Sequence, residues 1–249
     1  MTVGDIYNYL DTIAPFETAD KSDNSGLLVG DMNAKVKKIL VCLDVTHDVI
    51  NEAVGLNIDL IISHHPLMYK PVKRVMTADP VHALIRGNLN FVAMHYNMDV
   101  AVGGTTDIML RLLGFPQSGE VIDYFGKIVT LDSAITAREL AEKCKAAFGC
   151  TVVRFTDGGK PVRRLGICSG GGDFLVEKVC EMGCDAYICG DVKWSNMVFA
   201  SNYGLTLVDA GHFHTEDVFC ADLVSRLREK FTRVWVEKAI NSIDVCEYC

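Results

Sequence analysis

Two adjacent histidines, His64 and His65, are the residues of this chain whose types and spacing point most directly to chemistry. They follow an apolar run, Leu60–Ser63, that is typical of a buried strand, and Pro66 comes directly after them. Side chains alternate between faces along a strand, so the two imidazoles can converge only beyond its end, where Pro66 keeps His65 extended. Open α/β sheets bind their ligands at the carboxyl ends of strands.

The histidine pair by itself leaves two interpretations open. The imidazoles can form hydrogen bonds at the end of a strand, or they can bind metal, since histidine is the commonest metal ligand. Neighbouring imidazoles that splay apart suit two metal ions, one each, better than a single ion.

Two further predicted strand ends carry candidate ligands. Asp99 follows the apolar run Phe91–Met94, and His212 follows the run Leu205–Val208. Glu216 lies four residues after His212, at the start of a predicted helix, and a four-residue step places both side chains on one face if the turn has formed at His212. Three strand ends would therefore supply nitrogen and carboxylate ligands, with no thiolate among them.

Three other polar segments lie near these strand ends. His95, four residues before Asp99, is a candidate for proton transfer or for holding a ligand in place, and a hydrogen bond to a backbone carbonyl is the alternative. For Asp191, a turn-forming or capping role is favoured over one in lining a cleft. The run Ser169–Gly172 could present backbone N–H groups to an anion or simply form a tight turn.

The elements that must position these residues alternate between strand and helix along the whole chain. Such alternation predicts an α/β fold with largely parallel sheet cores. Strands are predicted at 38–44, 58–63, 90–95, 126–131, 151–155, 164–168, 185–189, 205–209 and 233–237. Helices are predicted at 3–13, 47–56, 80–87, 105–113, 136–148, 173–182, 193–202 and 216–231.

The chain contains a weak internal repeat. Residues 39–65 can be laid over residues 165–191 without a gap, and both segments read as strand, turn, helix and strand. The overlay pairs Asp59 with Asp185, and in each half a third strand follows that ends near a candidate ligand. Because identity is low, chance similarity is the alternative to a true repeat.

The repeat favours two related α/β lobes over a single large domain. A chain of 249 residues can bury either one large core or two smaller ones. We predict a first lobe at 1–115 and a second at 116–249, with a metal cluster gathered from both. The boundary is expected in the segment 114–126, which contains glycine, proline and serine.

The composition narrows the classes of function. The net charge of −8 argues against binding to nucleic acid or to anionic membranes, which requires basic surfaces. No amino-terminal leader and no apolar run long enough to span a bilayer is visible. The ten cysteines, most of them in apolar runs, fit reduced thiols in the cytoplasm, which is the predicted location. The terminal motif Cys246–Cys249 is interpreted as structural or adventitious rather than as a zinc or redox site.

Three segments form a recognisable set in chain order: Ser63-His64-His65-Pro66, Asn97-Met98-Asp99 and Gly211-His212-x-x-x-Glu216. Together they resemble the motifs of the dinuclear-metal proteins named after an Ngg-interacting factor, whose bacterial members are labelled GTP cyclohydrolase I type 2 homologues. The likeness covers nearly the whole chain, including Ser22–Gly26, which is similar to the family's Trp-Asp-Asn-x-Gly. The chain departs from the family pattern at Ser22, Tyr96 and Ser195, and none of these residues is a metal ligand in that pattern.

The resemblance implies two interlinked α/β lobes of related topology, with mostly parallel or mixed sheets flanked by helices, assembled into a homohexamer. It also implies two divalent metal ions per chain. By the family pattern His64 and Asp99 bind one ion, His65 and His212 bind the other, and Glu216 bridges them. Nitrogen and oxygen donors without sulfur suit zinc, iron, manganese or nickel.

Two functions follow from this resemblance. The first is a metal-dependent hydrolase acting on GTP or a related nucleotide through a metal-bound hydroxide, with a phosphoesterase as its rival. Two divalent ions with two carboxylates and one hydroxide remain net positive, which favours an anionic or nucleotide substrate. The second is a non-catalytic metal-binding hexamer with a regulatory, metal-storage or partner-docking role. Most metal clusters with open coordination positions are catalytic, so the hydrolase is favoured over the non-catalytic role.

Overall fold

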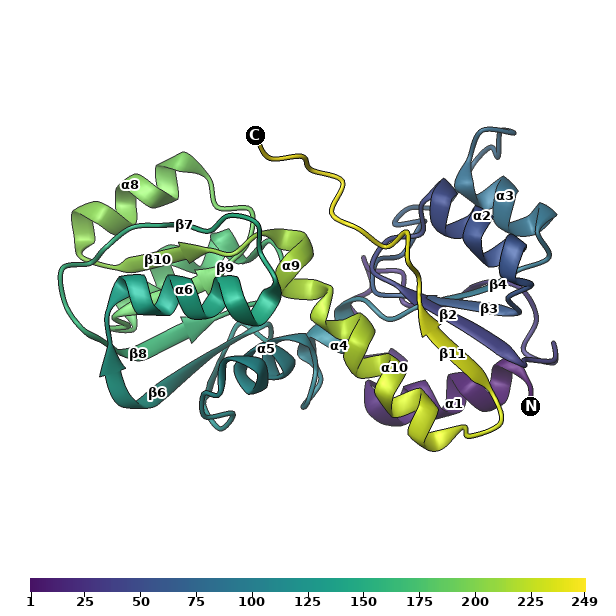
Figure 1. The fold of residues 1–249 in the computed structure, drawn as a ribbon, viewed down its shortest axis with the longest axis horizontal. Coiled ribbons are helices and arrows are strands. Elements are labelled where there is room, and N and C mark those ends of the chain that lie inside the picture. Colours follow the sequence, from purple (N-terminus) through teal and green to yellow (C-terminus); the bar gives the residue numbers. More distant parts are fainter. The chain divides into compact units, whose positions relative to one another are not determined.

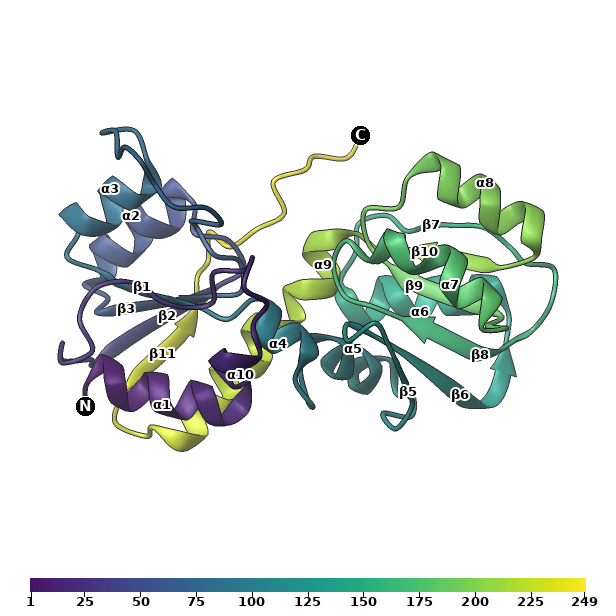
Figure 2. The ribbon, with the colours of Figure 1, turned by 180° about the vertical axis from the view of Figure 1, so that it is seen from behind.

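The computed structural model describes residues 1–249, which form two compact units. The first unit contains Met1–Gly104 and Phe219–Val245, and the second contains Thr105–Val218 and Cys246–Cys249. Each unit has one β-sheet with helices on both of its faces (Figure 1, Figure 2). The predicted fold class, two α/β lobes with mixed sheets flanked by helices, is confirmed.

The sheet of the first unit has the strand order β1-β4-β3-β2-β11. Strands β4, β3, β2 and β11 run parallel to their neighbours, and β1 is antiparallel at the edge. The three middle strands are buried along nearly their whole length, which explains why their sequences are almost continuous apolar runs. The strands span Gly26–Val29 (β1), Lys38–Cys42 (β2), Leu60–Ser63 (β3), Asn90–Ala93 (β4) and Trp235–Lys238 (β11).

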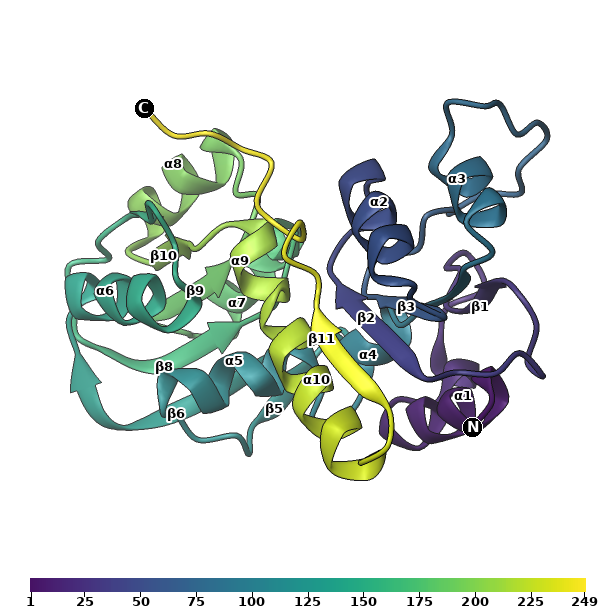
Figure 3. The same ribbon diagram turned by 45° about the vertical axis from the view of Figure 1, so that its right-hand side comes forward.

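Helices α2 and α3 cover one face of this sheet, and α1 and α10 cover the other (Figure 3). Local signals begin these helices where expected: Thr2 and Asp5 form a capping box on α1, and the Thr46 side chain accepts a hydrogen bond from the backbone N–H of Val49 in α2. The helices of the first unit are α1 (Val3–Ile13), η1 (Phe16–Thr18), α2 (His47–Leu56), α3 (Pro80–Arg86), α4 (Tyr96–Val100) and α10 (Val218–Lys230), whose first residue belongs to the second unit.

The sheet of the second unit has the strand order β5-β6-β8-β9-β10-β7. The inner strands β8, β9 and β10 are parallel, and the others are antiparallel to their neighbours. The strands span Glu120–Ile122 (β5), Gly126–Ile135 (β6), Arg154–Phe155 (β7), Val162–Ile167 (β8), Ala186–Cys189 (β9) and Thr206–Asp209 (β10).

Apolar cores lie on both faces of the second sheet. One core packs Leu110 of α5 and Leu140 of α6 with β-strand residues, and the other packs Val179 of α7 and Met197 of α8. The helices of this unit are α5 (Thr105–Leu113), α6 (Ala137–Phe148), η2 (Gly172–Leu175), α7 (Val176–Glu181), α8 (Trp194–Tyr203) and α9 (His212–Glu216).

The internal repeat is present in the strand register of the two units. Ile39 of β2 pairs with Leu60 of β3, and the overlaid residues Leu165 and Ala186 pair in the same way. The carboxylate of Asp59 accepts hydrogen bonds from two successive backbone N–H groups at the start of β2, and the carboxylate of Asp185 does the same at β8. The similarity between the two units therefore includes equivalent hydrogen bonds as well as the order of strands and helices.

The two units divide the chain differently from the lobes expected at 1–115 and 116–249. Helix α5 belongs to the second unit because its apolar side chains pack in that core, and residues 219–245 belong to the first unit. The C-terminal return occurs because β11 pairs in parallel with β2, which joins Trp235 to Lys38. A pairing between residues so far apart in the chain has no local sequence signal.

The predicted strands and helices are all present, with shifts at their ends. The strand expected at 151–155 is only the two residues of β7, and the helix expected from 216 begins at Val218 after the separate turn of α9. Besides α9, four short elements were not predicted, β1, β5, α4 and η1, because three to five residues are too few to show a period. No helix of the chain combines the length and apolar character needed to cross a membrane.

Candidate functional site

The first unit brings together four of the predicted site residues at the carboxyl ends of β3 and β4. These strands are parallel neighbours, so the residues after them meet at one edge of the sheet. His64, His65 and His95 each offer a ring nitrogen, and these atoms lie within 4.8 Å of one another. The Nε2 atom of His64 lies 3.5 Å from Oδ1 of Asp99. The two adjacent histidines therefore converge as predicted, with ring centroids 5.2 Å apart.

His64 is completely buried, and its ring orientation is set by the backbone. Its Nδ1 atom lies 2.7 Å from the carbonyl oxygen of Met94, directly after β4. A carbonyl oxygen can only accept, so Nδ1 carries the proton and the lone pair of the neutral ring is on Nε2. This tautomer is the one that a metal ligand needs.

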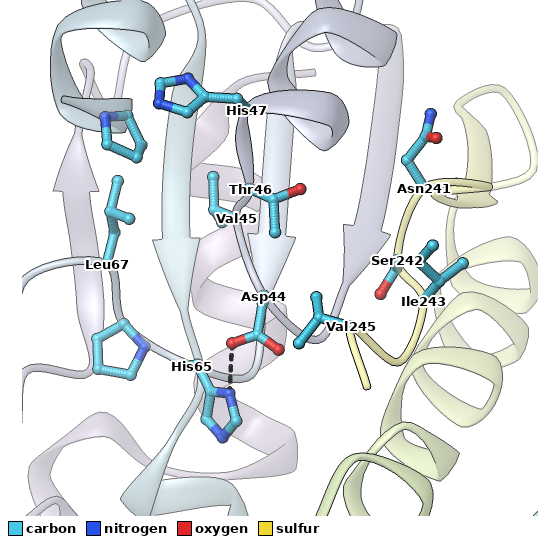
Figure 4. A pocket seen from close by; sticks show the side chains of 12 residues that line it. Asp44, Val45, Thr46, His47, His65, Leu67, Asn241, Ser242, Ile243 and Val245 are labelled. Carbon is cyan, nitrogen blue, oxygen red and sulfur yellow. Dashed lines mark hydrogen bonds and ion pairs between the residues drawn. The ribbon is translucent and has the colours of Figure 1, made fainter. Parts of the chain in front are cut away.

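His65 is oriented by a carboxylate that sequence reasoning did not find. Its Nδ1 atom lies 2.8 Å from Oδ1 of Asp44, which follows β2 (Figure 4). The same argument places the lone pair of His65 on Nε2. The available signal was the position of Asp44 shortly after the neighbouring strand end, but only the sheet order shows that β2 lies beside β3.

His95 is held by the segment Ser22–Gly26. Its Nδ1 atom lies 2.6 Å from Oδ1 of Asp23, and the Ser25 hydroxyl donates to the other oxygen of that carboxylate. Burial by itself would raise the pKa of Asp23, but the hydrogen bonds from His95 and Ser25 outweigh it and lower this pKa to about 2. The expected alternative, a bond from the His95 ring to a backbone carbonyl, is replaced by this carboxylate pair.

The second unit brings together His212 and Glu216 on the single turn of α9. The turn is formed at His212, as the four-residue spacing required, and His212 Nε2 lies 2.9 Å from Glu216 Oε2. The other ring nitrogen, Nδ1, lies 2.7 Å from Oδ2 of Asp191. The hydrogen bond to Glu216, opposed by burial and helped by Asp191, raises the pKa of His212 to about 9. Asp191 also has the left-handed backbone typical of a turn, with φ of 55°.

Glycines make room for Glu216 and His212. A side chain on Gly170, whose φ is +60°, would overlap the Glu216 carboxylate. A side chain on Gly190 would overlap the backbone of His212. The backbone N–H of Gly170 donates to the Thr215 hydroxyl at 3.0 Å, so the run Ser169–Gly172 is a tight turn packed against α9.

The donors that each unit brings together are of the types that bind divalent first-row metals. The imidazoles of His64, His65 and His212 each have Nδ1 bonded to an acceptor, which directs Nε2 toward a ligand position. The carboxylates of Asp99 and Glu216 supply oxygen donors, and no cysteine is among the candidate ligands. Such donors could bind a metal ion, orient a bound water and move a proton through His95.

Comparison with known proteins gives consistent matches over nearly the whole chain. Residues 1–244 match the family described as Duf34/NIF3 (NGG1p interacting factor 3). A Clostridium perfringens protein named GTP cyclohydrolase 1 type 2 homolog is 30% identical over 92% of both chains, and a Clostridium acetobutylicum protein of that name is 30% identical over 87% of this chain and 85% of its own length. Among solved structures, a Staphylococcus aureus hypothetical protein is similar with a TM-score of 0.90, 26% identity and coverage of 100% and 99%. A Bacillus cereus protein related to NIF3 shares the fold, with a TM-score of 0.90, 20% identity and the same coverage.

Proposed function

The chain belongs to the Duf34/NIF3 family, and from that premise we propose that it is a metal-dependent hydrolase acting on GTP or a related nucleotide. The observation that carries this proposal is the shared arrangement of His64, His65 and His212. Each ring is held at Nδ1 by an acceptor, which makes Nε2 the metal-directed atom, and on His212 a metal would replace the Nε2 proton that Glu216 accepts. Histidines that serve only as strand-end hydrogen-bond donors do not need this common orientation.

The proposed ligands of the centre are those that the family pattern implies. His64 and Asp99 would hold one divalent ion, His65 and His212 the other, and Glu216 would bridge them. Within each unit the neighbouring ligands are already close, at 3.5 Å for His64 with Asp99 and 2.9 Å for His212 with Glu216. When bound, such ions lower the pKa of water and compensate negative charge on a substrate.

His95 is the proposed proton-transfer residue. It lies beside the two ligand histidines, with its ring centroid 5.3 Å from that of His64 and 5.6 Å from that of His65. The Asp23 carboxylate, whose pKa of about 2 keeps it charged at neutral pH, pairs with Nδ1 of the imidazole and fixes the ring. A histidine held in this way can accept a proton from water and return it to a leaving group.

The nucleotide substrate is supported by the relatives' names and by charge. The curated relatives named above are labelled GTP cyclohydrolase 1 type 2 homologs. Two divalent ions would contribute four positive charges, whereas Asp99 and Glu216 contribute two negative charges. The occupied centre would therefore attract an anionic group.

A turnover assay of the full chain loaded with zinc, iron, manganese or nickel tests this proposal. GTP and a panel of phosphoesters serve as substrates, and metal content is measured by elemental analysis. We expect GTP turnover that falls at least 100-fold in Glu216→Gln, because this change removes a charged ligand. Glu177→Gln, at an exposed glutamate of α7, is the matched control and should retain full activity.

The assay also separates the alternatives. Turnover of phosphoesters but not GTP would indicate a phosphoesterase. Activity that survives in Glu216→Gln would exclude the cluster as the catalyst. Two bound ions without turnover of any substrate would indicate the non-catalytic metal-binding role.

A further inference from the structure

A cavity of about 510 Å³ lies beside His65 in the first unit. Its volume is within the range of small-molecule sites, roughly 300–1,000 Å³. Figure 4 shows Leu67 on one side and Ile243 and Val245 on the other, with the Asp44–His65 pair at the end of the cavity. The apolar part of the wall is formed by Val45, Pro66, Leu67, Pro80, Ile243 and Val245.

The C-terminal wall of this cavity is anchored by hydrogen bonds. The Glu52 carboxylate accepts from the backbone N–H groups of Ile240 and Asn241 and from the Asn241 side chain, each at 2.9 Å. The Ser242 hydroxyl accepts from the backbone N–H of Leu43 at 3.0 Å. Residues 240–242 are therefore fixed against α2 and the end of β2, and the wall residues Ile243 and Val245 follow directly after this anchored stretch.

The side chains of the lining favour an uncharged ring over a phosphate group. No lysine or arginine lines the cavity, and its one carboxylate is Asp44. Because Asp44 already pairs with His65, a phosphate group inside the cavity would lie beside a carboxylate and find no lysine or arginine to pair with. An uncharged ring, by contrast, can bury its faces against the apolar walls.

The polar groups of the lining favour hydrogen-bond donors on that ring. Asp44 uses Oδ1 for His65, and its second oxygen remains an acceptor on a half-exposed side chain. Asn241 uses its amide nitrogen for Glu52, which leaves its amide oxygen as a second acceptor. The hydroxyl of Thr46 accepts from Val49 and can donate in turn.

We propose that this cavity binds the uncharged heterocycle of the substrate, an aminopurine ring whose N–H donors face Asp44 and Asn241. The proposal rests on the proposed function, and it places the ring next to His65 and the phosphate groups away from the cavity. Guanine has the required chemistry, because its ring N–H and its 2-amino group are adjacent donors on an uncharged base. The specificity for the base would then come from the segment after β11.

Binding of guanosine to the purified, metal-loaded full chain, measured by isothermal titration calorimetry, tests this proposal. Ile243→Asp places a second acidic group in the wall and should weaken guanosine binding at least tenfold. Ile240→Asp is the matched control, because Ile240 is 84% exposed on the same segment and does not line the cavity. Inosine, which lacks the 2-amino donor, should bind about tenfold more weakly than guanosine, as expected for one hydrogen bond to a charged acceptor. Ribose 5-phosphate should bind equally to all three proteins.

The outcomes test guanosine binding in the cavity separately from hydrolysis of a nucleotide. Equal guanosine affinity in the wild type, Ile240→Asp and Ile243→Asp, or no guanosine binding at all, would overturn the cavity assignment even if GTP is turned over. Guanosine binding that is lost only in Ile243→Asp would support the cavity even if no nucleotide is hydrolysed, in which case the proposed reaction fails.

Discussion

The residues that orient the candidate ligands differ in charge. His64 donates to the backbone carbonyl of Met94, whereas His65 and His212 are paired with the carboxylates of Asp44 and Asp191. A carboxylate partner raises the basicity of an imidazole more than a neutral carbonyl does, and it fixes the same ring orientation. The two ion positions of the proposed centre would therefore be unequal, and the position of His65 and His212 would be expected to bind metal more tightly.

Replacing Asp44 tests whether the two ion positions differ in metal affinity. Asp44→Asn keeps the size of the side chain but removes its charge, so one of the two ions should bind about 10–100-fold more weakly. Metal affinity and stoichiometry are measured by competition with a chelator of known affinity. Asp48→Asn, at an exposed aspartate of the neighbouring helix α2, is the control. Unchanged affinity of both ions in Asp44→Asn would contradict the role assigned to this carboxylate.

The lowered pKa of Asp23 predicts that the stability of the metal-free protein depends on pH. Its pKa is lowered from the ordinary value of 3.8 to about 2 in the folded chain, so the folded state favours the charged form of the carboxylate. The difference corresponds to about 2 kcal/mol of unfolding free energy, present above about pH 4 and lost as the pH falls through 2. Asp23→Asn should therefore be less stable than the wild type at pH 7, and the difference should shrink toward pH 2.

Urea unfolding of the chelator-treated protein at several pH values measures this difference. Asp48→Asn, at an exposed aspartate of α2, should follow the wild-type profile. A stability difference for Asp23→Asn that stays constant between pH 7 and pH 2 would show that the carboxylate does not act through its charge.

At the scale of elements, the second unit positions its ligands with one short turn and two close backbone approaches. Helix α9 has only five residues, so it is stabilised by its surroundings rather than by its own hydrogen bonds. Thr215 ties it to the run Ser169–Gly172 through the N–H of Gly170, and Gly190 lets the end of β9 approach His212. The small residues near the site are thus required by packing against α9.

Gly170→Ala tests this packing. The added methyl group would overlap the Glu216 carboxylate, and the positive φ would be strained as well, so we expect a loss of stability of about 1–3 kcal/mol. The carboxylate should also be displaced, which would lower metal content. Gly183→Ala has a similar positive φ but no atom within 4 Å of the added carbon, so it isolates the backbone cost. Chemical unfolding and elemental analysis of both variants give the comparison, and equal metal content in the two would contradict the displacement.

At the scale of the whole molecule, two copies of one strand-helix-strand plan carry different chemistry. The first unit has His64-His65 where the second has Gly190-Asp191, so one unit supplies imidazoles and the other supplies a partner for His212. The chain returns to the first unit through α10 and β11, which completes the first sheet beside β2.

Truncation separates the roles of the C-terminal segments. A chain ending at Arg233 lacks β11, whose Val236 is buried, and exposes the edge of β2. We expect loss of hydrogen-exchange protection in β2 and reduced metal content.

A chain ending at Val245 lacks only the Cys246–Cys249 motif. Its free energy of unfolding should differ from that of the wild type by less than about 0.5 kcal/mol, the usual size of a surface change. Loss of metal from the chain ending at Val245 would instead give the terminal cysteines a role.

The sequence by itself determined those features that depend on near neighbours in the chain. These include the alternation of strands and helices, the internal repeat and the close approach of His212 to Glu216, because the period of a strand and the four-residue step of a helix are local properties. The tertiary structure alone decided that Asp44, Asp23 and Asp191 orient the histidines, that β11 lies beside β2, and that the segment after β11 closes a cavity. These pairings join residues that are distant in the chain, and they are set by strand order and side-chain packing, for which a sequence has no local signal.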